Sequence, residues 1–227
     1  MKALVLSGGG LFGAWQAGAW SVLAERFEPD LIVGASIGSL NGYLIACGVD
    51  PEELISIWRN PAFRRLQELE KTLQGWMQHY SLRRPLAVTV TDILTMKAWI
   101  ARDEEITWRH LAASCAVPLA MPQVKIGGRW CTDGGLLAPL PVWAAVELGA
   151  TEIEGLQVLG KFPSPLLGPL VAAFRGVAGK SDTVPTGVDL RVREPRELLG
   201  DLKTTLWGTQ MDVERWIQQG IEDAQGW

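Results

Sequence analysis

The stretch Leu31-Ile32-Val33-Gly34-Ala35-Ser36-Ile37-Gly38 decides how this chain folds. Its first three residues are β-prone and apolar, which predicts a buried strand over Leu31–Val33. The residues from Ile37 to Cys47 are mostly apolar and small, and they predict a buried helix. Glycines separate the two segments, so we expect a sharp strand-to-helix turn with Ser36 at its apex. Such a unit is typical of an α/β fold.

The same alternation of strand and helix continues on both sides of this unit. Strands are predicted at residues 3–6, 86–90, 98–101, 153–159 and 188–192, with a hairpin of 123–126 and 129–132 around Gly127-Gly128. Helices are predicted at residues 15–27, 51–58, 63–80, 107–113, 142–148 and 211–224. Residues 161–185 are rich in Pro and Gly and predict an irregular surface excursion. With 227 residues, no linker and no internal repeat, we expect a single domain over residues 1–227.

Composition excludes several classes of protein. The chain has 21 basic and 25 acidic residues, a net charge of −4, which argues against a nucleic-acid-binding protein. The three cysteines form no CxxC pair and the two histidines are isolated, so no metal site is expected. The N-terminus lacks the apolar segment of a signal peptide, and the uncharged residues 31–49 contain too many polar residues and glycines to span a bilayer. We therefore expect a soluble, cytoplasmic protein.

Gly34-Ala35-Ser36-Ile37-Gly38 has the form G-x-S-x-G. Between a strand and a helix, this pattern describes a nucleophile elbow, a strained turn that exposes a serine hydroxyl. Gly34 and Gly38 allow neighbouring backbone to approach without a Cβ clash. Ser36 is therefore a candidate catalytic nucleophile.

An earlier glycine motif, Gly8-Gly9-Gly10-Leu11-Phe12-Gly13, follows the first strand and opens a helix. Alone it fits the dinucleotide fingerprint G-x-G-x-x-G, so a nucleotide-binding Rossmann-like module is one alternative. That module also needs an acid at the carboxyl end of the second strand, whereas Asp30 precedes the strand. Beside Ser36, the same loop would instead supply backbone amides to an oxyanion.

A third motif, Asp133-Gly134-Gly135, follows the predicted hairpin. An Asp-Gly pair is ordinarily a turn. However, no histidine follows position 110, so the Ser-acid-His order of α/β-hydrolases cannot be completed. An aspartate held by glycines is then a credible acceptor for the Ser36 proton.

Together these motifs resemble the patatin-like phospholipase family, with further similarity at Ala113-Ser114-Cys115-Ala116-Val117-Pro118. The resemblance implies a three-layer α/β/α sandwich with a mostly parallel sheet and helices on both faces. It implies an acyl hydrolase acting on lipid or other carboxylic esters, with Ser36 as nucleophile and Asp133 as base. Oxyanion-hole amides would come from Gly8, Gly9 and Gly10, and no metal or cofactor would be needed. Gly13, Gly34, Gly38, Gly134 and Gly135 would support the motifs. A non-catalytic interaction protein with the same fold is a second alternative.

Two features bear on the substrate. The family usually has Arg or Lys before the last glycine of the first motif, and this chain has Phe12, which favours simple esters over phospholipids. An apolar stripe including Phe63, Leu73 and Trp76 is most simply a packing surface. That stripe, or residues 162–174, would otherwise be the surface for transient contact with a membrane or micelle.

Overall fold

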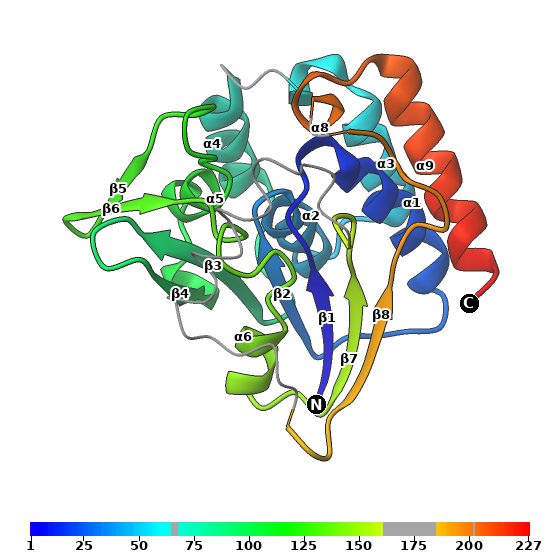
Figure 1. The fold of residues 1–227 in the computed structure, drawn as a ribbon, viewed down its shortest axis with the longest axis horizontal. Helices are drawn as coiled ribbons and strands as arrows, with labels where there is room; N and C mark the ends of the chain where they lie inside the picture. The colour runs from blue at the N-terminus through cyan, green and yellow to red at the C-terminus, as the bar shows by residue number, and fades with distance from the viewer. Residues whose placement is uncertain (65–67, 161–184, 202) are drawn as a thin grey trace.

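The computed structural model describes residues 1–64, 68–160, 185–201 and 203–227. Its centre is an eight-stranded sheet (Figure 1). Seven strands follow the order β5-β6-β3-β2-β1-β7-β8, and the eighth, β4, pairs with β3 outside this order. The strands are β1 (Lys2–Leu6), β2 (Leu31–Ala35), β3 (Leu86–Asp92), β4 (Lys97–Arg102), β5 (Val124–Ile126), β6 (Arg129–Thr132), β7 (Glu152–Leu156) and β8 (Asp189–Arg193). Strands β3, β2, β1, β7 and β8 run parallel, β4 and β6 each pair antiparallel with β3, and β5 pairs antiparallel with β6. The predicted mostly parallel α/β sheet is confirmed.

Alternating side chains of the central strands face two separate cores. Leu4, Leu6 and Ile32 belong to the larger core. Ala3 and Val5 belong to the smaller one. Because both faces of these strands are covered, the strands are apolar at nearly every position, as parallel strands require. The layers are therefore unequal in thickness.

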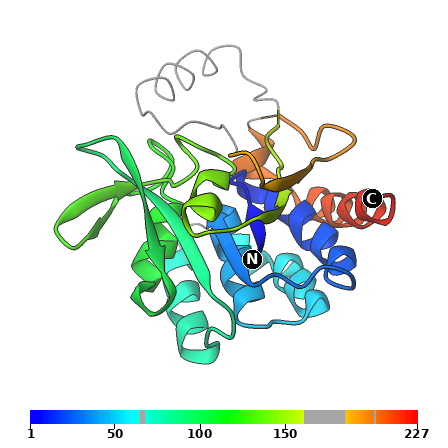
Figure 2. The same cartoon turned by 90° about the horizontal axis from the view of Figure 1, so that it is seen from below.

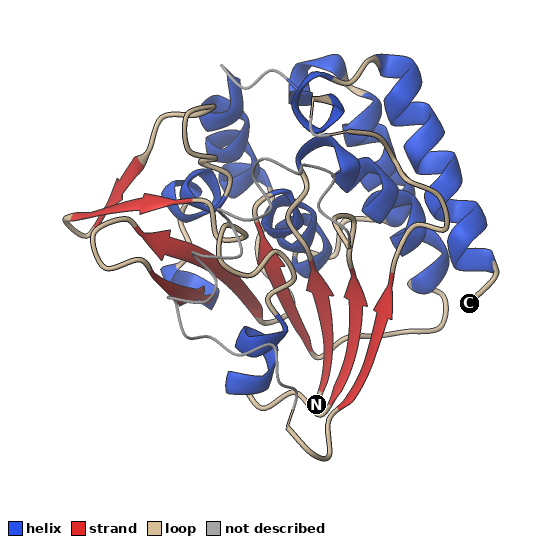
Figure 3. Cartoon of the chain, viewed as in Figure 1, coloured by secondary structure: helices blue, strands red, loops and turns tan. Residues whose placement is uncertain are grey.

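Helices cover the two faces unequally. On the larger core lie α1 (Gly13–Leu23), α2 (Ile37–Ala46), α3 (Pro51–Arg59), α4 (Leu69–His79), α5 (Trp108–Ser114) and α9 (Gln210–Gln225). In the described part of the chain, α6 (Val142–Glu147) is the helix that packs on the smaller core, through Ala144 and Ala145. Figure 3 shows the strands as one continuous fan beside the larger group of helices. The C-terminal α9 packs lengthwise against α1, as both views of the ribbon show (Figures 1 and 2).

Three predicted elements differ from the structure by three or more residues at one end. The helix predicted at 15–27 ends at Leu23. The helix predicted at 63–80 is a 3-10 turn, η2 (Pro61–Arg64), followed by α4 from Leu69. At the start of η2 the side chain of Asn60 accepts the N–H of Ala62, and its carbonyl accepts that of Phe63. The strand predicted at 153–159 ends at Leu156, because Val158 donates its N–H to the Ser7 hydroxyl. The excursion predicted at 161–185 lies almost entirely outside the described residues.

The apolar stripe of α4 is a packing surface. Leu73 is fully buried, and Leu69 and Trp76 are nearly so, within the larger core. These three residues pack as the packing interpretation predicts. None of the described helices combines the length and the apolar character needed to cross a bilayer. The alternative surface at 162–174 lies outside the described residues.

Candidate active site

Ser36 occupies the turn between β2 and α2. Its backbone has φ 53° and ψ −129°, a left-handed conformation that a residue with a Cβ adopts only under constraint. The Ser36 N–H donates to Oγ of Ser114 (2.8 Å), and its carbonyl accepts from the N–H (2.8 Å) and the hydroxyl (2.6 Å) of Ser39. These bonds hold the strained turn, and the predicted elbow conformation is confirmed.

The two elbow glycines permit close backbone packing. A Cβ on Gly34 would lie 2.5 Å from Cα of Ser39, and one on Gly38 would strike the carbonyls of Leu6 and Ser7 at the end of β1. Real Cβ atoms do not approach other atoms so closely, so the turn tolerates no side chain at either position. This close approach brings the end of β1 and its glycine loop beside Ser36.

Asp133 lies directly after β6 and is held by backbone bonds to neighbouring elements. Its N–H donates to Ala116 and its carbonyl accepts the Thr91 hydroxyl (3.0 Å), while the N–H of Gly134 donates to the carbonyl of Ser114. A Cβ on Gly134 would overlap the Thr89 carbonyl, so the loop packs tightly on β3. Ser114 therefore holds both loops, through its hydroxyl at Ser36 and its carbonyl at Gly134.

Sequence reasoning did not assign Ser114 a role. The signal was its place in the motif of residues 113–118, but the motif does not show which strands its side chain and carbonyl reach. Its hydroxyl also donates to the Thr89 carbonyl (2.8 Å), so Ser114 bridges β3 and the elbow. We assign Ser114 a positioning role.

The carboxylate of Asp133 is buried and half-satisfied. Its Oδ1 accepts the N–H of Gly135 at 2.7 Å. Its Oδ2 is buried and has no hydrogen-bond partner among the described residues. Burial raises the pKa of Asp133 from 3.8 to about 6, against the opposing effects of the Ser36 hydroxyl and the Gly135 N–H. Such a group is a stronger base than an ordinary aspartate and remains mostly ionised at neutral pH.

Ser36 and Asp133 line one cavity of about 160 Å³, together with the loop after β1. Ser36 is 7% exposed and Asp133 6% exposed, so both reach this space from below the surface. The carboxyl ends of β1, β2 and β3 meet at this edge of the sheet, which is where parallel α/β folds place their sites.

The three glycines of the loop have different backbone partners. The N–H of Gly8 donates to the carbonyl of Pro139 at 2.9 Å. Among the described residues, none accepts a hydrogen bond from the N–H of Gly9 or Gly10. Both glycines line the cavity, and a 3-10 turn, η1 (Gly10–Phe12), leads from them into α1. Gly8 packs beside Ser36, since a Cβ there would lie 3.1 Å from Cβ of Ser36.

A buried polar network fixes this loop from beneath. Gln16 donates to the carbonyls of Ser7 (2.9 Å) and Leu156 (3.2 Å), and its Oε1 accepts from Asn41 (3.0 Å). Asn41 accepts the indole N–H of Trp58 at 2.9 Å. The Ser7 hydroxyl donates to the Gly8 carbonyl at 3.0 Å. The network therefore links α1, α2 and α3 to the start of the glycine loop.

Comparison with known families agrees with this geometry. The sequence profile described as patatin-like phospholipase matches residues 4–99 and 94–146, which contain Ser36 and Asp133. The chain belongs to the patatin-like phospholipase family. The resemblance inferred from the motifs is thereby confirmed.

Individual relatives of this patatin-like chain are distant. Lysophospholipase NTE1 of Kluyveromyces lactis is 25% identical over 177 residues, and lysophospholipase nte1 of Aspergillus oryzae is 28% identical over 182 residues. Each match covers 68% of this chain and 12% of the relative, so the matched part spans about an eighth of those proteins. The crystal structure of VipD from Legionella pneumophila has a TM-score of 0.61 at 13% identity, covering 99% of this chain and 66% of that one. It supports the fold.

The departure at Phe12 has a structural reason in this patatin-like domain. Phe12 is 2% exposed, and its ring packs edge-on against Trp216 of α9 with centroids 5.0 Å apart. A charged side chain in this place would be buried without a partner, at high cost. Gly13 beside it leaves room for Trp58, since a Cβ there would lie 2.6 Å from the indole. Phe12 thus anchors the glycine loop to the C-terminal helix.

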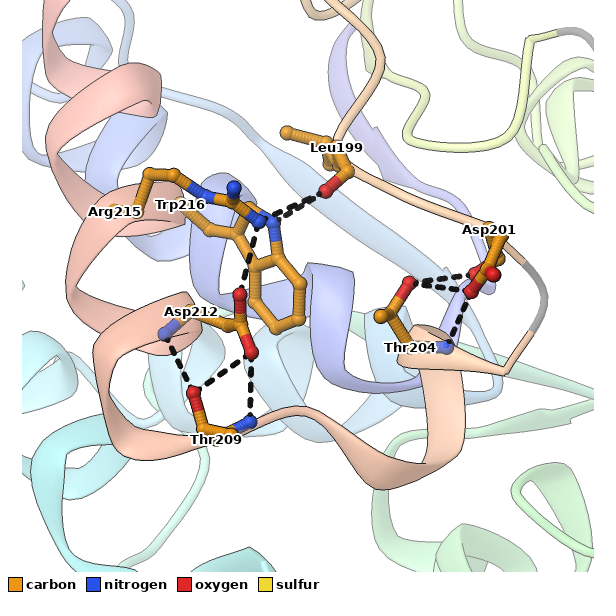
Figure 4. Close-up of polar contacts among 7 residues, drawn as sticks. All are labelled: Leu199, Asp201, Thr204, Thr209, Asp212, Arg215 and Trp216. Atoms are coloured by element: carbon orange, nitrogen blue, oxygen red, sulfur yellow. Dashed lines mark hydrogen bonds and ion pairs between the residues drawn. The ribbon is translucent and has the colours of Figure 1, made fainter.

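The segment before α9 contributes to the wall of the cavity. Short helix α8 (Thr204–Trp207) brings Thr205 and Leu206 to the cavity. The segment is attached to α9 because the carbonyl of Leu199 accepts the indole N–H of Trp216 at 2.8 Å, as Figure 4 shows. The reciprocal cap between Thr209 and Asp212 then starts α9.

The nucleotide-binding alternative lacks its ribose acid in the described structure. Asp30 accepts the N–H of Lys2 at 2.8 Å, at the amino end of the parallel strands and away from the glycine loop. The residue at the carboxyl end of β2 is Ser36. Together with family membership, this disfavours the Rossmann-like interpretation.

Proposed function

We propose that this protein is a serine acyl hydrolase that cleaves carboxylic esters, lipid esters among them. The observation that carries the proposal is the pairing, in one cavity, of a serine on a strained elbow with a buried aspartate whose Oδ2 has no hydrogen-bond partner among the described residues. The NTE1 relatives are named lysophospholipases, which supports lipid esters as substrates. A non-catalytic interaction protein with this fold would need neither the strained serine nor the buried aspartate.

In the proposed reaction, the Ser36 Oγ attacks the ester carbonyl while its proton passes to Oδ2 of Asp133. The N–H groups of Gly9 and Gly10 hold the oxyanion, and the amino end of α1 adds favourable potential. The C–O bond to the leaving alkoxide then breaks, and Asp133 returns the proton to that oxygen. Asp133 next takes a proton from water, whose hydroxide attacks the acyl-enzyme, and finally reprotonates Ser36 as the acid leaves.

A fluorophosphonate probe tests the assignment directly. We expect labelling of the wild type, and none of Ser36→Ala, because the probe reacts only with an activated serine. Ser36→Ala and Asp133→Asn should each lower hydrolysis of p-nitrophenyl acetate by about 10³-fold or more. Ser56→Ala, an exposed serine on α3, is the matched control and should keep full activity. Labelling of Ser36→Ala, or near-normal turnover by it, would refute the proposal.

We also propose transient contact with lipid surfaces through the mouth of the site. Leu119 is fully exposed next to Val117 and Pro118 of the cavity wall, and Trp207 is 68% exposed next to Leu206. Exposed apolar side chains at the mouth of a site are typical of proteins that touch lipid. Vesicles of phosphatidylcholine should co-sediment the wild type more than the Leu119→Ser/Trp207→Ser variant. Val192→Ser on the edge strand β8 is the control, and equal pelleting of all three proteins would exclude the contact.

A further inference from the structure

A second cavity, of about 70 Å³, also reaches Ser36. It shares Ser36, Gly10, Val117 and α8 with the first cavity but does not include Asp133. Its remaining walls are apolar side chains, chiefly Leu40, Trp58, Phe63, Leu69 and Met121. Ser36 therefore stands where the two cavities meet, and only the first of them contains a carboxylate, that of Asp133; we call the second the apolar cavity.

The chemistry assigns different parts of an ester to these two cavities. The leaving alkoxide must take its proton from Asp133, so it lies in the cavity that contains Asp133. The acyl chain is bonded to the opposite side of the carbonyl carbon and extends away from the alkoxide. The apolar cavity is the described space that also reaches Ser36 and is lined by groups suited to methylenes. Burial raises the pKa of Cys115 in its wall, so this residue contributes a neutral thiol.

Part of the wall of the apolar cavity is a pair of aromatic side chains, Trp58 and Phe63. Trp58 is fully buried and its indole N–H is held by Asn41 at 2.9 Å. The Phe63 ring packs edge-on against Trp58, with centroids 5.0 Å apart, and against Trp76 at 5.4 Å. Trp76 itself does not line the cavity, so Phe63 separates the cavity from the core behind it.

The size of the cavity limits the chain that it accepts. A dry cavity of about 150 Å³ holds benzene, with six carbons, so about 70 Å³ accommodates roughly three carbons. We propose that this cavity is the acyl-chain chamber and that Phe63 ends it, which selects acyl groups of about four carbons including the carbonyl. The proposal rests on the proposed ester hydrolysis and adds its chain-length selectivity.

The test is the rate profile over p-nitrophenyl acetate, butyrate, octanoate and dodecanoate. The wild type should cleave butyrate at least tenfold faster, in kcat/KM, than octanoate, because each buried methylene is worth 10-fold or more when a pocket fits or excludes it. Phe63→Ala should raise the octanoate-to-butyrate ratio at least tenfold. Leu69→Phe, which fills the chamber, should lower the butyrate-to-acetate ratio about tenfold.

Met77→Ala on α4 is the matched control, since Met77 packs against the same core but does not line the chamber, and its profile should equal that of the wild type. Phe63→Leu is a milder variant should Phe63→Ala fail to fold, and it should move the ratio in the same direction. A wild-type preference for octanoate or dodecanoate, or a ratio unchanged in both Phe63 variants, would overturn the chamber assignment. Absence of any acetate hydrolysis would instead refute the proposed function.

Discussion

At the scale of single residues, the pKa of Asp133 sets a pH limit on activity. A base must be ionised, and burial places this pKa at about 6. We expect kcat/KM for p-nitrophenyl acetate to rise tenfold per pH unit below pH 6 and to level off above about pH 7. If kcat/KM instead rises with a midpoint near pH 4, the pKa of an exposed aspartate, the result would contradict the buried environment of the carboxylate.

The same carboxylate links stability to pH. Its folded pKa is raised, so the folded state binds more protons than the unfolded state between about pH 4 and pH 6, and stability falls as pH rises through this window. Asp133→Asn removes this penalty and should be more stable than the wild type above pH 6, by about 2 to 3 kcal/mol from a shift of about two units. The difference in free energy of unfolding should vanish near pH 4, as urea denaturation at several pH values will show.

Several residues were predictable because their signals are local. Ser36 and its elbow conformation follow from glycines two positions away, and Asp133 was chosen because no later histidine exists. The partner of the Gly8 N–H was not predictable. That N–H donates to Pro139, which is distant in sequence, and no local pattern shows where a distant carbonyl will lie.

At the scale of elements, the buried network joins three helices to the glycine loop through Gln16 and Asn41. Gln16→Leu leaves the Ser7 carbonyl without its side-chain donor and removes one of two bonds from the Leu156 carbonyl and the Asn41 amide, so we expect a loss of about 1 to 3 kcal/mol of stability. We also expect kcat to fall more than KM changes, because the loop that holds the oxyanion loses its support. Gln218→Leu, an exposed glutamine on α9, should alter neither quantity.

Element bounds were predictable where periodicity governs them and not where a single side chain does. The hairpin of β5 and β6 matches its prediction because Gly127 and Gly128 both adopt positive φ, 54° and 85°, as a two-residue turn demands. The end of β7 does not match its prediction, since the Ser7 hydroxyl takes the N–H of Val158, a bond that no hydrophobic pattern reveals.

At the scale of the whole molecule, α9 is attached to α1 by a buried bond between residues 208 positions apart. Trp15 donates to Oδ2 of Asp223 at 2.8 Å, and Asp223 is 3% exposed. Asp223→Ala leaves the indole N–H unpaired, so we expect the free energy of unfolding to fall by about 1 to 3 kcal/mol. Glu222→Ala, the exposed neighbour, should change it by less than about 0.5 kcal/mol in the same denaturation experiment.

The α/β class and the parallel sheet follow from the alternation of strands and helices, which the sequence displays. Strand order does not, because the same alternation is compatible with several orders. The packing of Phe12 on Trp216 is likewise a long-range result, and it shows why a family's basic position is apolar in this chain.

The left-handed backbone of Ser36 has a consequence for engineering. Glycine adopts φ 53° without strain, so Ser36→Gly should abolish activity and yet raise the melting temperature, with a gain of about 1 kcal/mol. Ser36→Ala keeps a Cβ and should lose activity without that gain. Directed evolution of this protein that selects for heat resistance alone would therefore enrich inactive variants such as Ser36→Gly. A selection for stability must also measure ester hydrolysis.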